Sequence, residues 1–192
     1  MTNFEKSCKK TLNFEGDYSN DFADAGGETY RGVSRVFFPQ WPGWKIIDSY
    51  KESSDFPKNL NSDEDLQQMI RDFYKKNFWD TIRLDEIDSQ NIAEELFDTG
   101  VNMGINRAKK FLQQALNFLN KNEELYDDLG EDGIIGERTL DALDIILKRG
   151  EEALLYKILN VLQANHYLTY MMKSPTQERF ARGWFSRVEF LK

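Results

Sequence analysis

The chain has 192 residues, of which 40% are hydrophobic and 14% aromatic, enough to build one compact domain or two small ones sharing a core. Its 33 acidic and 25 basic residues give a formal net charge of -8, and no polybasic run is present. We therefore expect no nucleic-acid partner and no binding to anionic lipid.

The first part of the chain is predicted to combine helices with a small sheet. Phe4, Cys8 and Leu12 lie at helical spacing, and this helix should end near Glu15 and Gly16, because glycine is favoured directly after a helix. Residues 17–38 break into turn residues and short β-prone runs, which indicates a hairpin or a three-stranded flap. A short helix is expected over residues 44–52.

The rest of the chain is predicted to be helical. One helix should start at Ser62 and continue toward Phe78, and a second, from Ile92, should be interrupted at Gly100 and Gly104. Apolar stripes or terminal signals then predict helices over residues 108–119, 137–149, 151–172 and 176–190. The predicted fold is mainly α with a small β-hairpin or three-stranded flap.

Two single residues limit the chemistry that is available. Cys8 is the one cysteine and His166 the one histidine, so neither an intrachain disulfide nor a Cys/His zinc site can form. Both lie in apolar helical patterns, which favours a structural role. We expect no cofactor and no metal, and a calcium loop starting at Asp128 is rejected because its twelfth position is Thr139.

No segment is long and apolar enough for a membrane span, and the first ten residues contain no apolar signal core. We therefore expect synthesis in the cytoplasm without a signal peptide, and work in the periplasm or cell wall only after release by a separate route. A monomer is expected rather than an oligomer.

The run LNFEGDYSNDFADAGGETYRGVS, residues 12–34, crowds five carboxylates and four glycines behind the first helix. Glu15 follows apolar neighbours, and an apolar environment keeps a carboxylic acid protonated, as the general acid of glycoside cleavage must be. Asp21 and Asp24 follow on a loop where a solvated carboxylate stays ionised. Thr29 can orient a water molecule, although the same run also suits an acidic surface loop.

This run resembles the E-G-G-Y-x-x-D-x-x-D-x-G-G-x-T-x-x-G-I signature of the glycosyl hydrolase 108 family of N-acetylmuramidases, found among phage-type endolysins and proteins described as secretion activators. Asp17 replaces the second glycine of the signature and Val33 replaces the isoleucine. The matching residues are Glu15, Gly16, Tyr18, Asp21, Asp24, Gly26, Gly27, Thr29 and Gly32. The resemblance implies a lysozyme-like α+β architecture.

Later segments resemble the same family. LFDTGVNMGINRAKKFLQQALN, EDGIIGERTLDAL and FARGWFSRVEFL look like its V-N-x-G segment, its peptidoglycan-binding region and its closing segment. The resemblance implies a catalytic region over residues 1–98 and a helical peptidoglycan-binding region over residues 99–192, packed into the same globule. Asn102 is a candidate for holding a sugar amide, although a helix kink explains it equally well. Trp41 and Trp44 are expected to be an exposed pair that contacts substrate.

The resemblance implies cleavage of the glycan strand of peptidoglycan after N-acetylmuramic acid. Glu15 would protonate the leaving oxygen, and Asp24 with Thr29 would activate water, with inversion favoured and Asp21 as the reserve carboxylate. Tyr18, Gly26 and Gly27 would support the loop. Two alternatives stay open: a lytic transglycosylase that uses Glu15 alone, and a non-catalytic protein that binds the wall or assists secretion.

Overall fold

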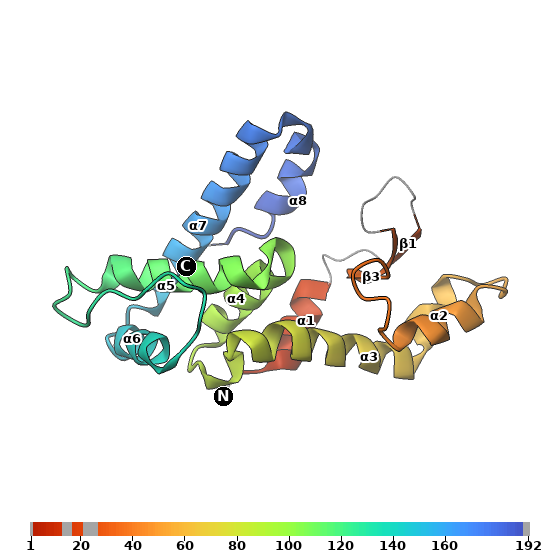
Figure 1. The fold of residues 1–192 in the computed structure, drawn as a ribbon, viewed down its shortest axis with the longest axis horizontal. Coiled ribbons are helices and arrows are strands. Elements are labelled where there is room, and N and C mark those ends of the chain that lie inside the picture. The colour runs from red at the N-terminus through yellow and green to blue at the C-terminus, as the bar shows by residue number, and fades with distance from the viewer. Residues whose placement is uncertain (1, 13–16, 21–26, 190–192) are drawn as a thin grey trace. The chain divides into compact units, whose positions relative to one another are not determined.

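The computed structural model describes residues 2–12, 17–20 and 27–189 (Figure 1). Two compact units are present: residues 4–77, called the N-terminal unit below, and residues 1–3 with 78–192, called the helical unit. The described residues contain eight α-helices and one three-stranded antiparallel sheet. The prediction of a mainly α, lysozyme-like fold with a small β flap is therefore confirmed.

Along the chain, the sheet of the N-terminal unit comes after the first helix and before the other helices. A π-helical turn, η2 (Lys75–Trp79), follows its last helix. The elements before that turn are α1 (Phe4–Leu12), β1 (Tyr18–Asn20), β2 (Glu28–Tyr30), β3 (Val33–Ser34), α2 (Gly43–Tyr50), the 3-10 helix η1 (Lys58–Ser62) and α3 (Glu64–Tyr74).

The sheet has the order β1-β2-β3, so β2 is its central strand. Arg31 and Gly32 join β2 to β3 with φ angles of 44° and 78°. Positive φ at both central residues defines the type I′ hairpin turn, whose twist matches that of the strands. This geometry accounts for the motif glycine at position 32.

Buried side chains of α1, β2, β3, α2 and α3 form the core of the N-terminal unit. Cys8 is 2% exposed, which confirms its predicted structural role, and burial raises the pKa of its thiol to about 12. Helix α3 starts at Glu64, two residues later than predicted, because the cap is Asp63, whose carboxylate accepts the Leu66 N–H at 2.8 Å. The fully buried core side chains include Tyr30, Val33, Ile47, Leu60 and Leu66.

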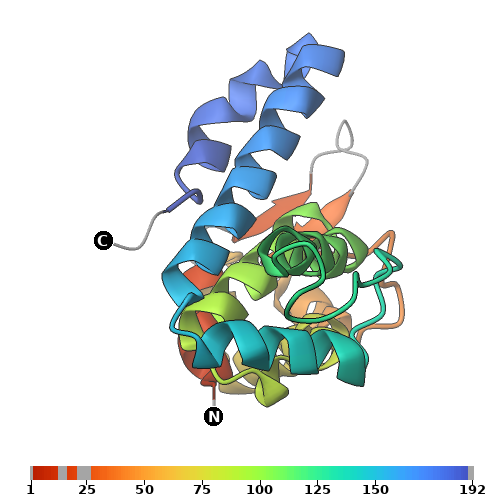
Figure 2. The same ribbon diagram turned by 90° about the vertical axis from the view of Figure 1, so that its left-hand side faces the viewer.

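The helical unit is built around three helices that pack on one another, α4 (Gln90–Met103), α5 (Ile105–Leu119) and α7 (Glu152–Lys173). The final helix predicted over residues 176–190 is divided into a 3-10 segment and a short α-helix, which returns alongside α7 (Figure 2). The other elements are η3 (Asp80–Ile82), η4 (Leu84–Glu86), α6 (Glu137–Lys148), η5 (Pro175–Phe180) and α8 (Ala181–Phe185).

The predicted interruption at Gly100 is wrong, because α4 continues through this residue to Met103. Gly100 instead allows the side chain of Ile82 to pack closely against α4, because a Cβ at this position would lie 3.0 Å from Cδ1 of Ile82. The break comes at Gly104, whose φ of 92° is open to glycine and costly for other residues. No helix among the described residues has the length and apolarity that a membrane crossing requires.

Candidate active site

The predicted catalytic run is only partly within the described residues. Glu15, Asp21, Asp24 and Gly26 lie outside them. The structure does place Tyr18 at the start of β1, Gly27 directly before β2, and Thr29 in the middle of β2. The strands β1 and β2 thus hold both ends of the segment that contains Asp21 and Asp24.

Thr29 lies at the centre of the sheet. It is paired with Ser19 of β1 on one side and Ser34 of β3 on the other. Directly paired residues share a face of an antiparallel sheet, so these three hydroxyl side chains lie on one face. Tyr30, the next residue, points to the opposite face and is fully buried. Thr29 therefore has a fixed position among polar neighbours.

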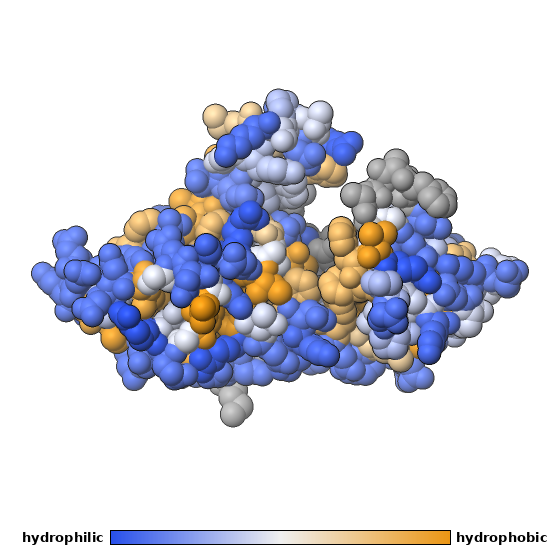
Figure 3. Space-filling view, viewed as in Figure 1, coloured by the Kyte–Doolittle hydropathy of each residue, from blue (hydrophilic) through white to orange (hydrophobic). Residues whose placement is uncertain are grey.

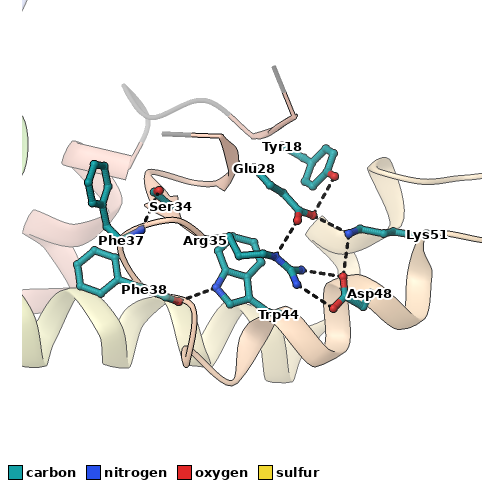
Figure 4. Close-up of polar contacts among 9 residues, drawn as sticks. All are labelled: Tyr18, Glu28, Ser34, Arg35, Phe37, Phe38, Trp44, Asp48 and Lys51. Carbon is teal, nitrogen blue, oxygen red and sulfur yellow. Dashed lines mark hydrogen bonds and ion pairs between the residues drawn. The ribbon is translucent and has the colours of Figure 1, made fainter. Parts of the chain in front are cut away.

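Glu28, beside Thr29, is the centre of a charged cluster that joins the sheet to α2 (Figure 4). Its carboxylate is 2.7 Å from Nε of Arg35 and 2.9 Å from Nζ of Lys51, and it accepts a hydrogen bond from the Tyr18 hydroxyl at 3.0 Å. Burial and this bond to Glu28 raise the pKa of Tyr18, which therefore remains a donor. The sequence predicts a supporting role for Tyr18 but does not indicate which residue it contacts. In the structure its hydroxyl contacts Glu28.

The same cluster continues to Asp48 of α2. Arg35 donates two hydrogen bonds to its carboxylate, at 2.7 and 3.0 Å, and Lys51 lies 2.8 Å from Oδ1. The Arg35 and Lys51 bonds lower the pKa of Asp48 to about 2. The Arg35 guanidinium also lies 4.5 Å from the centroid of the Trp44 ring, within the range of a cation–π contact. Arg35, directly after β3, therefore connects this part of the chain to α2 through both charge and packing.

We expect Glu28→Gln to destabilise the protein by about 1 kcal/mol, because it removes one charge from a cluster whose two cations are each only about a third exposed. Urea unfolding measures this difference. Glu52→Gln, at an exposed position of the same unit, is the matched control and should leave the midpoint unchanged. Equal midpoints for the two variants would show that the cluster contributes nothing.

The expected exposure of Trp41 and Trp44 is wrong, because the two side chains are 9% and 3% exposed. Their rings pack edge to face at 5.2 Å, and Trp41 also contacts Phe73. The Trp44 indole donates a hydrogen bond to the Phe38 carbonyl at 2.8 Å. These contacts bury the apolar faces of both rings, so little of either is available to stack on a sugar.

Three exposed apolar residues lie just before this pair in the sequence. Val36, Phe37 and Phe38 are 60%, 67% and 38% exposed, and they follow β3. Figure 3 shows hydrophobic surface in the region of β3. Gly27 is adjacent to them, since a Cβ on it would lie 3.0 Å from Cγ2 of Val36. The sequence signal was the unbroken apolar run VFF between polar turns, which cannot be one face of a helix or strand.

Asn102 lies in the last turn of α4 and belongs to the helical unit. Its Oδ1 accepts a hydrogen bond from the Tyr167 hydroxyl at 2.7 Å. Burial raises the pKa of Tyr167, and its ring stacks on Trp184 at 5.1 Å. The side-chain amide of Asn102 is thus oriented by an aromatic pair, while its contact with a sugar stays a prediction.

The described part of the chain contains no group of three or more His, Cys, Asp and Glu side chains arranged to hold a metal ion. The polar groups around the sheet pair with one another instead.

The fold defines the class: a mainly helical, lysozyme-like protein whose small sheet flanks an acidic loop in the sequence. Within that class the chain belongs to the glycosyl hydrolase 108 family, whose model matches residues 8–104, just over half of its length. The family model described as Predicted Peptidoglycan domain matches residues 107–189. The chain is thus a glycoside hydrolase with peptidoglycan as a partner, and the family predicted from the sequence is confirmed.

A solved structure supports the fold independently. The structure of Brucella abortus SagA matches with a TM-score of 0.58 and 22% sequence identity, over 96% of this chain and 88% of that one. No curated protein sequence matches the chain significantly. The two family matches meet between residues 104 and 107, whereas the compact units divide between residues 77 and 78. The predicted boundary at residue 98 stays a prediction.

Proposed function

We propose that this protein is an N-acetylmuramidase that hydrolyses the glycan strand of peptidoglycan after N-acetylmuramic acid. One observation carries the proposal: the glycosyl hydrolase 108 match covers the run from Glu15 to Gly32, in which every acidic and hydroxyl position of the signature is kept. The peptidoglycan-binding match in the second half of the chain supports the substrate. The enzyme then acts at the cell wall.

Glu15 is the general acid of this proposal. It protonates the departing glycosidic oxygen, and positive charge builds at the anomeric carbon as the bond breaks. The apolar residues before it in the sequence favour the protonated form of its carboxyl group. Asp17, the departure from the signature, forms an ion pair with Arg31 at 3.6 Å, so its charge has a partner in the hairpin turn.

Asp24 is the general base, and it takes a proton from the water that attacks the opposite face of the sugar. Thr29 aligns this water, and its central position in a three-stranded sheet supports that role because the strand on each side fixes its backbone. We expect inversion of the anomeric centre, which requires a separation of about 6.5–9.5 Å between the two carboxyl groups, against about 5–5.5 Å for retention. Asp21 helps to orient the loop.

The choice between the two loop carboxylates is tested by the variants Asp24→Asn and Asp21→Asn. Loss of the general base should lower the rate of sugar release by a factor on the order of 10²–10⁴, whereas loss of an orienting residue costs less. Reducing ends released from purified peptidoglycan give both rates. The assignment is wrong if Asp24→Asn keeps near-normal activity while Asp21→Asn loses it.

A further inference from the structure

The helical unit contains a pocket that the proposed reaction does not use. It has a volume of about 500 Å³ and lies where α4 ends and α5 begins. Arg107, Lys110, Phe111 and Gln114 line it from α5. These positions are spaced by three, one and three residues, so they share one face of the helix. The pocket wall is therefore an ordered helical surface.

Glu131 also lines the pocket, and the loop after it is fixed by Gln113, which is only 2% exposed. The Gln113 amide donates to Oδ1 of Asp132 at 2.8 Å, and its oxygen accepts the N–H of Gly133 at 2.8 Å. Gly133 has a φ of 78°, and a Cβ there would lie 2.1 Å from Oδ1 of Asn106. The loop is thus held close to α5 in one conformation, with Glu131 at its start.

The charges in this pocket are of both signs. Among the described residues neither Arg107 nor Lys110 forms an ion pair, and Arg107 donates one hydrogen bond, to the Met103 carbonyl. Asp132, the next residue after Glu131, accepts hydrogen bonds from Gln113 and from the Ile134 N–H. Two cations of α5 and the carboxylate-bearing Glu131 thus line the same pocket, in a chain whose formal net charge is -8.

His166 of α7 senses the positive charge of Arg107 and lies beside Phe111. Its ring lies 6.5 Å from that of Phe111 and stacks on Tyr170. Burial lowers the pKa of His166, and the charges of Arg107 and Lys173 lower it further.

We infer that this pocket binds the peptide stem of peptidoglycan, with Arg107 and Lys110 holding a carboxylate and Glu131 receiving an amino group. The apolar surfaces of Phe111 and Met103 suit the methylene chain of a diamino acid between these charged ends. Glu131 disfavours the main rival, a phosphate polymer, which offers negative charge alone. The inference rests on the proposed function, because it takes peptidoglycan as the partner and assigns a part of it to this pocket.

The first test compares binding of three probes to the whole protein by calorimetry: a disaccharide–tripeptide that contains diaminopimelate, the same fragment with its carboxylates amidated, and the disaccharide alone. The first should bind most tightly. Charge-assisted hydrogen bonds contribute enough that Arg107→Gln/Lys110→Gln should weaken this binding about 10- to 100-fold. The double variant Lys148→Gln/Lys157→Gln removes the same charge from exposed positions of the same unit and should change nothing.

The second test uses His166, whose single imidazole gives an unambiguous NMR titration. A carboxylate bound at Arg107 offsets part of the charge that lowers the His166 pKa, so the tripeptide fragment should raise that pKa and the amidated fragment should not. This measurement uses the wild-type protein and does not depend on how well a variant folds.

The inference is overturned by equal binding of the three probes, by a Gln variant that binds like the control, or by preferential binding of poly(glycerol phosphate). Failure of the proposed function is distinguishable, because it is measured as the absence of glycan cleavage in purified peptidoglycan. Loss of probe discrimination in a protein that still cleaves the glycan rejects this pocket alone.

Discussion

Glu15→Gln is expected to lower the rate of peptidoglycan cleavage by a factor on the order of 10²–10⁴ while the protein stays folded. Glutamine has nearly the same shape as glutamic acid, but its amide cannot deliver a proton to the leaving oxygen. Clearing of a suspension of purified peptidoglycan gives the rate, and thermal unfolding shows whether the fold is kept.

Glu5→Gln provides the matched control for this experiment. Glu5 is exposed on α1, the helix that precedes Glu15 in the chain, and it has no part in the proposed reaction. The control should cleave at the wild-type rate. Near-normal cleavage by Glu15→Gln would reject the general-acid assignment, and with it the proposed mechanism.

Trp79→Ala is expected to produce the largest loss of stability, about 3–5 kcal/mol. Trp79 is fully buried, packs against Phe97 with ring centroids 5.7 Å apart, and donates its indole N–H to Asp85 at 2.7 Å. Domains of this kind are stable by about 5–15 kcal/mol, so the variant should lose a large part of its stability. Chemical denaturation, with the slope compared between variants, measures the change.

Two further substitutions separate the causes of this loss. Trp79→Phe keeps most of the apolar volume but lacks the indole donor, so its cost should be clearly smaller than that of the alanine variant. Trp184→Ala removes the same side chain from a partly exposed position on α8 and should also cost less. A Trp79→Ala variant as stable as the wild type would contradict the burial that assigns this residue to the core.

The helices were predictable from the sequence because each buries an apolar stripe with a period near 3.6 residues. The predicted range 137–149 ends one residue after Glu137–Lys148, and the predicted range 151–172 is shifted by one residue from Glu152–Lys173. The sheet was also predictable as a flap, because turn residues and β-prone runs alternate within residues 17–38. Gly100 was misinterpreted because a glycine that permits close packing and one that ends a helix look alike in a sequence.

The candidate site was predictable only as a motif. The spacing of Glu15, Asp24 and Thr29 carries the chemistry, but nothing in it shows that Glu28 pairs with Arg35 and Lys51, since these contacts join separate elements. The same limit explains the error at Trp41 and Trp44. Their place near the flap suggested that they are exposed, whereas packing against one another and of Trp41 against Phe73 buries them.

Digestion of purified peptidoglycan in ¹⁸O-labelled water, with mass spectrometry of the released fragments, tests the proposed hydrolysis most directly. We predict that the wild-type protein releases fragments whose muramic acid ends are reducing and carry the label, and that Glu15→Gln releases almost none. Unlabelled anhydro-muramic ends, or labelled ends released equally fast by Glu15→Gln, would contradict the account.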